Sequence, residues 1–345
     1  MKLGLRLDYQ TAPDSGALSL VREAESLGYD SVWVSELNGA DAFTSSAWIL
    51  ARTDRIKCGT AVIQIPARTP TMAAMTAMTL GELSGGRFIL GVGPSSARVI
   101  EGWHGDLYGK PLTRTREYIR IIRQVLKGEG PLEFQGECYH VPNTEPGSTG
   151  LARSLKSALV PQPDLRIFTG TVSPGGLAVA AEVADGVIPL FMDPARYDLF
   201  EGPLAQGFAK AGNGKDPASF EIAPSVKIAM DDDLDKARFE VKRFLAPYLG
   251  GMGARANYYA DHARKLGWED AMSRIQQLFG GGQRSEAIAA VPDGLCDQVA
   301  LVGSKGRIRD RLGAWREAAR NGCVGAMLIT GGTPESLRFL AEEML

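Results

Sequence analysis

The run RFILGVG at residues 87–93 decides the fold, because every residue after Arg87 is apolar or glycine. A strand with one face in water alternates polar and apolar residues, whereas a strand buried on both faces is apolar throughout. Helical patterns flank this run, PTMAAMTAMTLGELSG at 70–85 and RTREYIRIIRQVLKG at 114–128. A buried strand between two helices is typical of a parallel sheet whose faces are covered by helices.

The same strand-then-helix pattern occurs seven more times along the chain. The additional strand-like runs lie at residues 3–7, 30–35, 56–64, 164–171, 185–191, 221–230 and 323–330. Parallel strands joined by right-handed helical crossovers form an open doubly wound sheet or a closed barrel. A count of eight favours the barrel, so the sequence predicts an α/β fold of the (β/α)8 TIM-barrel type.

Two stretches do not follow this repeat, and we interpret them as insertions. The segment at about 130–164 contains a predicted hairpin, LEFQGECYHV, and a loop rich in glycine, serine and threonine, while the segment at about 231–303 is mostly helical in pattern. No composition typical of an interdomain linker occurs, so we expect one domain over residues 1–345. Insertions between barrel strands usually build the site at the carboxyl ends of the strands.

Composition excludes several classes of function. The 38 Lys and Arg residues nearly balance the 40 Asp and Glu residues, and the net charge of −2 argues against nucleic acid or an anionic membrane as a partner. The four cysteines, at 58, 138, 296 and 323, form no CxxC pair, and no HExxH or similar cluster occurs, so we expect no disulfide framework and no metal. Neither a signal peptide nor a membrane span is predicted, which favours a cytoplasmic location.

The turn GVGPSS at 91–96 is a candidate anion site. Its glycines allow a ligand to approach the backbone closely, and the hydroxyls of Ser95 and Ser96 are potential phosphate partners. The spacing differs from GxGxxG, so a Rossmann site is not indicated. An ordinary tight turn between strand and helix explains the same residues.

A second candidate anion site lies in TVSPGG at 171–176. Ser173 and Pro174 predict the start of a helix, and Gly175 and Gly176 are expected to leave the first amide groups bare. Exposed N–H groups at a helix N-terminus attract anions. An ordinary capped helix is the alternative.

Four polar side chains follow strand ends and are candidates for chemistry. Glu36 lies where barrel enzymes place working carboxylates, although a loop residue that caps a helix is an equal alternative. Gln64 and Arg68 follow the third predicted strand, and Arg68 is also suited to a structural ion pair. His104 lies in the loop after GVGPSS. Its imidazole could exchange a proton with a substrate, and the alternative is that it only holds the loop together.

These motifs occur together in an order that resembles the luciferase-like family of flavin and F420 enzymes. The stretches that carry the resemblance are MKLGLRLDY, GYDSVWVSE, RIKCGTAVIQIPARTP, LSGGRFILGVGPSS, KPLTRTREYIRIIRQVL and AAEVADGVIPLF. The chain resembles most closely the F420-dependent oxidoreductases of the mycobacterial and actinobacterial type. The resemblance implies a luciferase-like TIM barrel that is often dimeric and binds coenzyme F420, or alternatively FMN, at its C-terminal mouth.

The resemblance also implies particular roles for residues of this chain. It places a non-prolyl cis peptide at Ala61–Val62, bulging against the cofactor ring, with Gln64 in contact with the ring and Glu36 near its pyrimidine part. Further cofactor contacts follow from it, namely Gly93, Pro94, Ser95, Ser96 and Val99 beside the tail and Val172, Ser173, Gly175 and Gly176 around the phosphate.

Two departures from the family bear on the substrate. The branch that acts on glucose 6-phosphate carries a histidine where this chain has Leu37, and an acidic residue where it has Ser96. Both proton-handling groups of that branch are therefore absent, which argues against sugar-phosphate oxidation. The chemistry then needs only hydride delivery, with a proton from water or from another group such as Glu36 or His104, which are the catalytic candidates.

We therefore predict an F420-dependent oxidoreductase that transfers a hydride between the cofactor and a small organic substrate. The residues expected to line the pocket are Phe43, Trp48, Trp103 and Tyr108. A homodimer or a higher even homo-oligomer is expected. An FMN-dependent monooxygenase and a non-catalytic cofactor-binding barrel are the alternatives, followed by a barrel enzyme that acts on a phosphate substrate.

Overall fold

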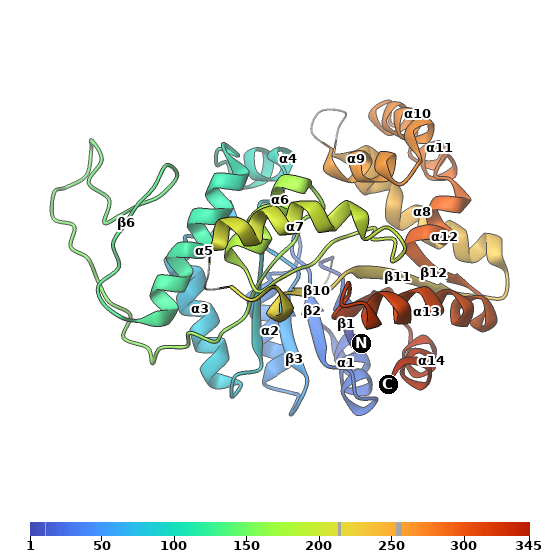
Figure 1. Ribbon diagram of the computed structural model, residues 1–345, viewed down its shortest axis with the longest axis horizontal. Helices are drawn as coiled ribbons and strands as arrows, with labels where there is room; N and C mark the ends of the chain where they lie inside the picture. Colours follow the sequence, from blue (N-terminus) through green and yellow to red (C-terminus); the bar gives the residue numbers. More distant parts are fainter. Residues whose placement is uncertain (11, 213–214, 253–256) are drawn as a thin grey trace.

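The computed structural model describes residues 1–10, 12–212, 215–252 and 257–345. All eight predicted runs form strands, and two of them are split into consecutive pieces (Figure 1). Residues 253–256, within the predicted second insertion, lie outside the described residues. The barrel strands are β1 (Lys2–Leu7), β2 (Ser31–Val34), β3 (Lys57–Thr60) with β4 (Ile63–Gln64), β5 (Phe88–Gly93), β8 (Ile167–Thr169), β9 (Gly186–Val187), β10 (Glu221–Ile222) with β11 (Ser225–Met230), and β13 (Ala326–Thr330).

The strands pair in parallel and close into a ring. The order runs from β10 through β9, β8, β5, β3, β2, β1 and β13 to β11. β10 and β11 are two pieces of one segment, 221–230, which pairs with β9 on one edge and with β13 on the other. Backbone hydrogen bonds bridge the break between the pieces, from Ala223 to Val187 and from Leu328 to Pro224, each 2.9 Å. The predicted (β/α)8 barrel is confirmed.

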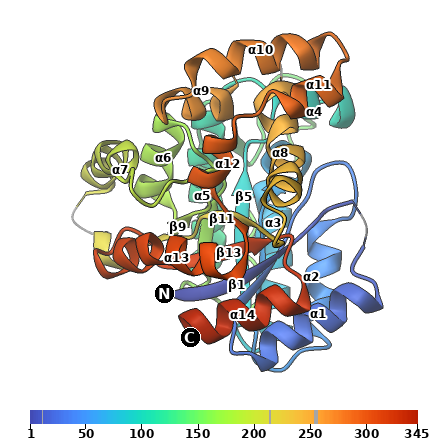
Figure 2. The same ribbon diagram turned by 90° about the vertical axis from the view of Figure 1, so that its right-hand side faces the viewer.

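Helices surround the ring and follow the barrel strands in turn (Figures 1 and 2). Most start at a side chain that accepts a backbone N–H, as Asp41 does from Thr44 at the start of α2. The predicted start of the last helix at Thr333 is confirmed, and a reciprocal capping box forms there with Ser336. The outer helices are α1 (Ser15–Ser26), α2 (Ala42–Leu50), α3 (Pro70–Leu83), α5 (Pro111–Lys127), α6 (Pro174–Val183), α7 (Asp198–Ala211), α13 (Lys305–Arg320) and α14 (Pro334–Met344).

The stretch 130–164 contains the predicted hairpin, formed by β6 (Phe134–Gln135) and β7 (His140–Val141). Glu117 of α5 anchors its turn, because the buried carboxylate accepts backbone N–H groups from Glu137, Cys138 and Tyr139 at 2.7–3.1 Å. A buried carboxylate with three donors remains stable without a cationic partner. The hairpin is thereby attached to the outer wall of the barrel.

The stretch 231–303 forms a helical layer and one strand that the sequence pattern does not reveal. Its helices are α8 (Leu234–Gly251), α9 (Tyr258–Lys265), α10 (Glu269–Gly280), α11 (Arg284–Ala289) and α12 (Asp293–Val299). The strand is β12 (Ala300–Gly303), which pairs in parallel with β11. Lys227 pairs with Ala300 on one edge of β11 and with Thr330 on the other, so β12 widens the sheet beyond the ring.

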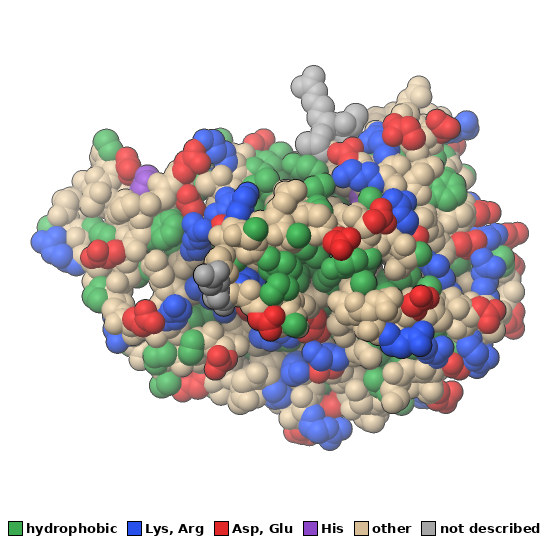
Figure 3. All heavy atoms as spheres, in the orientation of Figure 1, with side chains coloured by type: hydrophobic (Ala, Val, Ile, Leu, Met, Phe, Trp, Pro, Cys, Tyr) green, Lys and Arg blue, Asp and Glu red, His purple; other side chains and the backbone are tan. Residues whose placement is uncertain are grey.

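Three apolar clusters account for most of the core. The largest joins the strands to the outer helices, and a second holds the helical layer together. The third fills the barrel interior, where the rings of Trp33 and Phe168 meet edge to face with centroids 5.4 Å apart. On the face drawn in Figure 3, Lys and Arg are interspersed with Asp and Glu around a central apolar area.

Two features of the described residues bear on the classes of function. None of the helices there has both the length and the apolar character needed to cross a membrane. No three His, Cys, Asp or Glu side chains in those residues gather closely enough to hold a metal ion.

Candidate functional site

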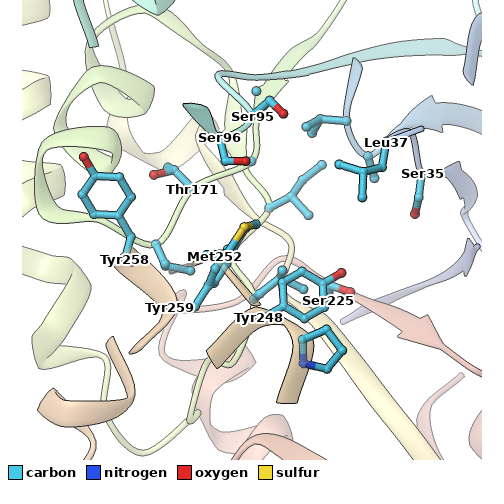
Figure 4. A pocket seen from close by; sticks show the side chains of 18 of the residues that line it. Ser35, Leu37, Ser95, Ser96, Thr171, Ser225, Tyr248, Met252, Tyr258 and Tyr259 are labelled. Atoms are coloured by element: carbon cyan, nitrogen blue, oxygen red, sulfur yellow. The ribbon is translucent and has the colours of Figure 1, made fainter. Parts of the chain in front are cut away.

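A cavity of about 2030 Å³ lies at the carboxyl ends of the barrel strands, between the strands and the helical layer (Figure 4). This end of the barrel is where TIM-barrel enzymes place their active sites. Loops after the strands supply one wall, and α8 and α9 supply another, with Tyr248 and Tyr259 directed inward among the labelled residues. The cavity exceeds the ~300–1,000 Å³ of most small-ligand pockets, so it has room for a long cofactor together with a substrate.

The structure brings nearly all the predicted site residues to this one cavity. The residues that line it are Glu36, Ala61, Val62, Gln64, Gly93, Pro94, Ser95, Ser96, Val99, Val172, Ser173, Gly175 and Gly176. His104 does not line it, since its side chain is exposed at the end of the π-helical turn η2 (Ile100–His104). Its predicted catalytic role therefore gains no support from the geometry.

The prediction of pocket-lining residues is wrong for two of the four. Trp103 and Tyr108 line the cavity, and the Tyr108 hydroxyl donates to the backbone oxygen of Ser95 at 3.2 Å. Phe43 is instead buried in the core against Phe88, and Trp48 lies on the outside of α2, beside Arg52. The helix that carries both residues covers the barrel wall below the mouth, which sequence spacing does not reveal.

The Ala61–Val62 peptide bond is cis, as the resemblance implies. It separates β3 from β4, and Val62 lines the cavity. Two glycines from neighbouring strand ends surround the Val62 side chain. A Cβ added at Gly93 would lie 2.5 Å from Val62 Cγ2, and one added at Gly170 would lie 3.0 Å from Val62 Cγ1. Any larger residue at these positions would displace Val62.

The Gln64 side chain is buried and joins three strand ends. Its oxygen accepts a hydrogen bond from Ser95 Oγ at 2.9 Å, and its amide nitrogen donates to the backbone oxygen of Leu37 at 2.6 Å. Both polar ends therefore already have a protein partner. Gln64 fixes the loops around the cavity, and it would contact a ligand through its remaining hydrogen-bonding capacity.

Glu36 is held by four hydrogen bonds rather than free for chemistry. Its two oxygens accept from Arg68 at 2.7 and 2.9 Å, and from the backbone N–H groups of Ala42 and Gln64 at 3.0 and 3.3 Å. Its side chain is only 6% exposed. Arg68 makes the structural ion pair that the sequence offered as its alternative, and it contacts Asp41 as well.

Asp41 is the exposed member of this cluster. Burial opposes its ionisation, but hydrogen bonds from Thr44 and the charge of Arg68 outweigh burial and lower the pKa of Asp41. The cluster Glu36–Arg68–Asp41 therefore ties the loop after β2 to the loop after β4.

The two candidate anion turns differ in how many of their groups are free. Ser96 Oγ is buried and has no hydrogen-bond partner among the described residues. In the second turn, Ser173 caps α6 by accepting the N–H of Gly176 at 3.1 Å, so the expectation of a bare Gly176 amide is wrong. Serine competes with any ligand for that first amide group.

The floor of the cavity is polar and cationic, which sequence reasoning missed. Arg6 of β1 donates to Ser225 Oγ and to the backbone oxygen of Ala61, each at 3.2 Å. Its Nε is buried without a partner, and no carboxylate of the described residues forms an ion pair with it. Thr169 Oγ1 is a second buried polar atom without a partner. A charged residue inside an otherwise apolar barrel strand was the available signal.

The opposite wall, from the helical layer, is aromatic. Phe191 meets Phe244, Tyr248 and Tyr259 with ring centroids 5.5–6.2 Å apart. His262 supports this cluster through a hydrogen bond of 3.1 Å to the backbone oxygen of Phe191, and burial lowers the pKa of His262 to about 4. This histidine is therefore neutral at physiological pH. The site thus combines a cationic floor, polar loops and a roof with an aromatic cluster.

Comparison with known proteins agrees with this geometry. Residues 3–321 match the family model described as luciferase-like monooxygenase. The chain is 41% identical over 344 residues to a Mycobacterium tuberculosis protein named as a coenzyme F420-dependent oxidoreductase, which covers 99% of this chain and 98% of that protein.

Solved structures with lower identity share the fold. The coenzyme F420-dependent tetrahydromethanopterin reductase of Methanopyrus kandleri matches with a TM-score of 0.76 and 21% identity, covering 99% of this chain and 97% of that one. A type II Baeyer–Villiger monooxygenase of Pseudomonas putida, solved with FMN, matches with a TM-score of 0.64 and 18% identity, covering 99% and 97%. Both cofactor types therefore occur on this barrel.

Proposed function

Since this chain belongs to the luciferase-like family, we propose that it is an oxidoreductase that transfers a hydride between coenzyme F420 and a small organic substrate in the cavity at the barrel mouth. The single observation that carries this proposal is the convergence of all the expected cofactor-binding residues on that cavity. The 41% identity to a protein named as F420-dependent favours F420 over FMN.

The lining of the cavity fits such a cofactor. Val62 offers an apolar projection for a planar ring, and Gly93 and Gly170 accommodate its side chain. Ser96 Oγ, buried without a partner, is a hydrogen-bond donor for the polar tail. The start of α6 at Ser173 supplies a helix N-terminus for a phosphate, with Ser173 able to exchange its bond to Gly176 for one to the anion.

The protein contributes binding, orientation and exclusion of water. F420 bound here would supply hydride chemistry at its ring. The loops around the cavity are fixed by the hydrogen bond between Gln64 and Ser95 and by the Glu36–Arg68 ion pair. The cavity is therefore preorganised for its ligand. Phe244, Tyr248 and Tyr259 exclude water from the opposite side. The aromatic cluster of the roof favours a substrate with an apolar body that carries a carbonyl group or a conjugated double bond.

An FMN-dependent monooxygenase is the second candidate. The fold that this chain shares with the FMN-containing monooxygenase of Pseudomonas putida supports it, at 18% identity. It predicts that reduced FMN, but not reduced F420, is consumed in the presence of oxygen. A non-catalytic barrel predicts cofactor binding without turnover.

The test is an anaerobic assay of the full chain with reduced F420 and a panel of ketones, aldehydes and conjugated enones. The proposal expects the visible absorbance of oxidised F420 to return with at least one member of the panel, and expects no requirement for oxygen. Turnover that needs FMN and oxygen would replace it with the monooxygenase. Tight binding of F420 with no turnover across the panel would favour the non-catalytic barrel.

We also propose that the chain forms a homodimer in the cytoplasm. Helix α3 leaves Met72 and Met75 on one face, 54% and 50% exposed, and α2 leaves Trp48 47% exposed. Met72 and Met75 are neighbours on the surface of α3, and contiguous exposed apolar patches mark sites of protein–protein contact. Light scattering coupled to gel filtration would show twice the chain mass of 37.0 kDa, and a mass of one chain would contradict the proposal.

A further inference from the structure

The proposed reaction needs a group that exchanges a proton, and the two residues expected for it are poorly placed. Glu36 is committed to Arg68 and two backbone N–H groups. His104 lies outside the cavity lining. Leu37 and Ser96 also line the cavity, but neither side chain ionises near neutral pH. The other side chains of the cavity and solvent remain as sources of the proton.

Lys227 has the position such a group requires. It lies on β11 two residues beyond Ser225, so both side chains project from the same face of the strand, and Lys227 is ~7 Å nearer the mouth. Ser225 contacts Arg6 at the floor, and Lys227 lines the cavity above it. A side chain added at Gly331 would occupy the place of Lys227 Nζ, so the ammonium group lies over the Gly331 backbone.

The ammonium group of Lys227 is half-buried and has no direct partner among the described residues. Within the described residues it forms neither a hydrogen bond nor an ion pair, unlike Lys57 and Lys242, which are paired with carboxylates. Burial lowers the pKa of Lys227, Arg243 lowers it further, and Glu240 and Asp8 act in the opposite direction. A lysine in such surroundings exchanges protons more readily near neutral pH than a solvated one.

The strand that carries Lys227 also lies opposite the strand that ends beside Val62. In the order of the ring, three strands separate the β3–β4 strand from the β10–β11 strand on either side, namely β5, β8 and β9 one way and β2, β1 and β13 the other. The two strands are therefore diametrically opposed. A ring that rests on Val62 turns its other face toward the wall that carries Lys227.

We propose that Lys227 is the proton donor and acceptor of the reaction, acting on a carbonyl or conjugated enone substrate held between Val62 and β11. This inference rests on the proposed function. In the reducing direction the substrate gains a hydride, which carries two electrons, at carbon, and one proton at oxygen or at the neighbouring carbon. The Lys227 ammonium gives that proton, becomes a neutral amine, and regains a proton from solvent at the cavity mouth. In the oxidising direction the amine accepts the proton.

The first test titrates the amine directly, without turnover. The full chain is pulsed with acetic anhydride over a series of pH values, and acetylation of Lys227 is compared with that of the exposed Lys156 by peptide mass spectrometry. We expect Lys227 to become reactive at lower pH than Lys156. We also expect saturating F420 to protect Lys227 several-fold and to leave Lys156 unchanged.

The second test uses variants and a substrate that the wild type reduces. Lys227→Met keeps an unbranched apolar stem and Lys227→Arg keeps the charge, but neither can exchange a proton near neutral pH. Both should lower kcat by ~10²-fold or more and abolish the pH dependence of kcat that the lysine causes, with the Kd for F420 within about threefold of wild type. The matched control is Lys236→Met, at an exposed lysine of α8.

The outcomes separate this inference from the function on which it rests. Normal F420 binding together with an ordinary titration of Lys227, or with wild-type kcat and pH profile in Lys227→Met, overturns the inference alone. Retained turnover in Lys227→Arg would mean that only the positive charge of the side chain is needed, for binding, and would also overturn the inference. Absence of F420 binding by the wild type overturns the proposed function, whatever the acetylation of Lys227.

Discussion

Removing Arg68 should expose how strongly the buried Glu36 carboxylate depends on its partner. Arg68→Met keeps much of the side-chain volume and deletes two charge-assisted hydrogen bonds of 2.7 and 2.9 Å. Loss of one partner of a buried ion pair typically costs ~3–5 kcal/mol, because the remaining charge is left in a poorly solvated place. Two backbone N–H groups continue to hold Glu36, and Arg68 is 20% exposed, so we expect about 3 kcal/mol, at the lower end.

A double-mutant cycle isolates the pair. Urea unfolding at pH 7 is measured for wild type, Arg68→Met, Glu36→Gln and the double variant, and the coupling energy is the departure from additivity. We expect a coupling of about 1.5–3 kcal/mol, because the double variant leaves no buried unpaired charge, and the remaining carboxylate of Asp41 is 43% exposed. The control cycle at Lys305 and Glu335, whose side chains are 52% and 67% exposed, should show no coupling above experimental error.

Additive effects in the Glu36–Arg68 cycle would refute this reasoning. They would mean that Glu36 is not bound as the structure has it, and that its carboxylate is available for the catalytic role first considered for it. A coupled cycle combined with turnover retained in Glu36→Gln would instead establish a structural role.

Further predictions concern the cavity and its support. His262 has a pKa of about 4 against 6.5 when solvated, so the unfolded chain binds its proton first, and the stability that neutral His262 provides is complete above pH 6.5 and is lost as pH falls toward 4. The free energy of unfolding of the wild type should be about 2 kcal/mol lower at pH 5 than at pH 7.5. This decrease should be absent in His262→Gln and present in His104→Gln, a variant of an exposed histidine. Gly93→Ala should weaken F420 binding by about ten- to a hundredfold in a fluorescence titration, because the new Cβ lies 2.5 Å from Val62 Cγ2. Gly313→Ala, on α13 outside the cavity lining and with no atom within 4 Å of the added Cβ, should bind as wild type, and equal affinities for the two variants would contradict the placement of the ring. Ser96→Ala removes a buried hydroxyl without a partner, so it should raise the melting temperature of the apo-protein and weaken F420 binding about tenfold, and no change in either would contradict the assignment.

The barrel was predictable because its strands are buried on both faces. Runs such as RFILGVG are apolar throughout, and eight of them in alternation with helices leave few other architectures. The strand β12 was not predictable, since ALVG is short and lies within a helical segment. Its pairing with β11 depends on where the chain returns after α12, which local pattern does not encode.

The site was predictable where residues follow strand ends, and less so where partners decide the role. Ser96 and Ser173 are near strand ends and reach the cavity, as expected. Whether Glu36 is free depends on Arg68, which lies 32 residues away in sequence. The roof contributed by Tyr248 and Tyr259 comes from an insertion whose position over the mouth only the tertiary structure reveals.

The most direct test of the central claim is a parallel binding titration of the purified apo-protein with F420 and with FMN, followed by fluorescence. The account predicts that F420 binds with a Kd at least ~100-fold lower than that of FMN, a difference of about 2.7 kcal/mol. It also predicts that Gly93→Ala weakens the binding of F420. Tighter binding of FMN would contradict the account and place the protein with the flavin monooxygenases, and binding of neither would leave the barrel without the cofactor that its cavity is proposed to hold.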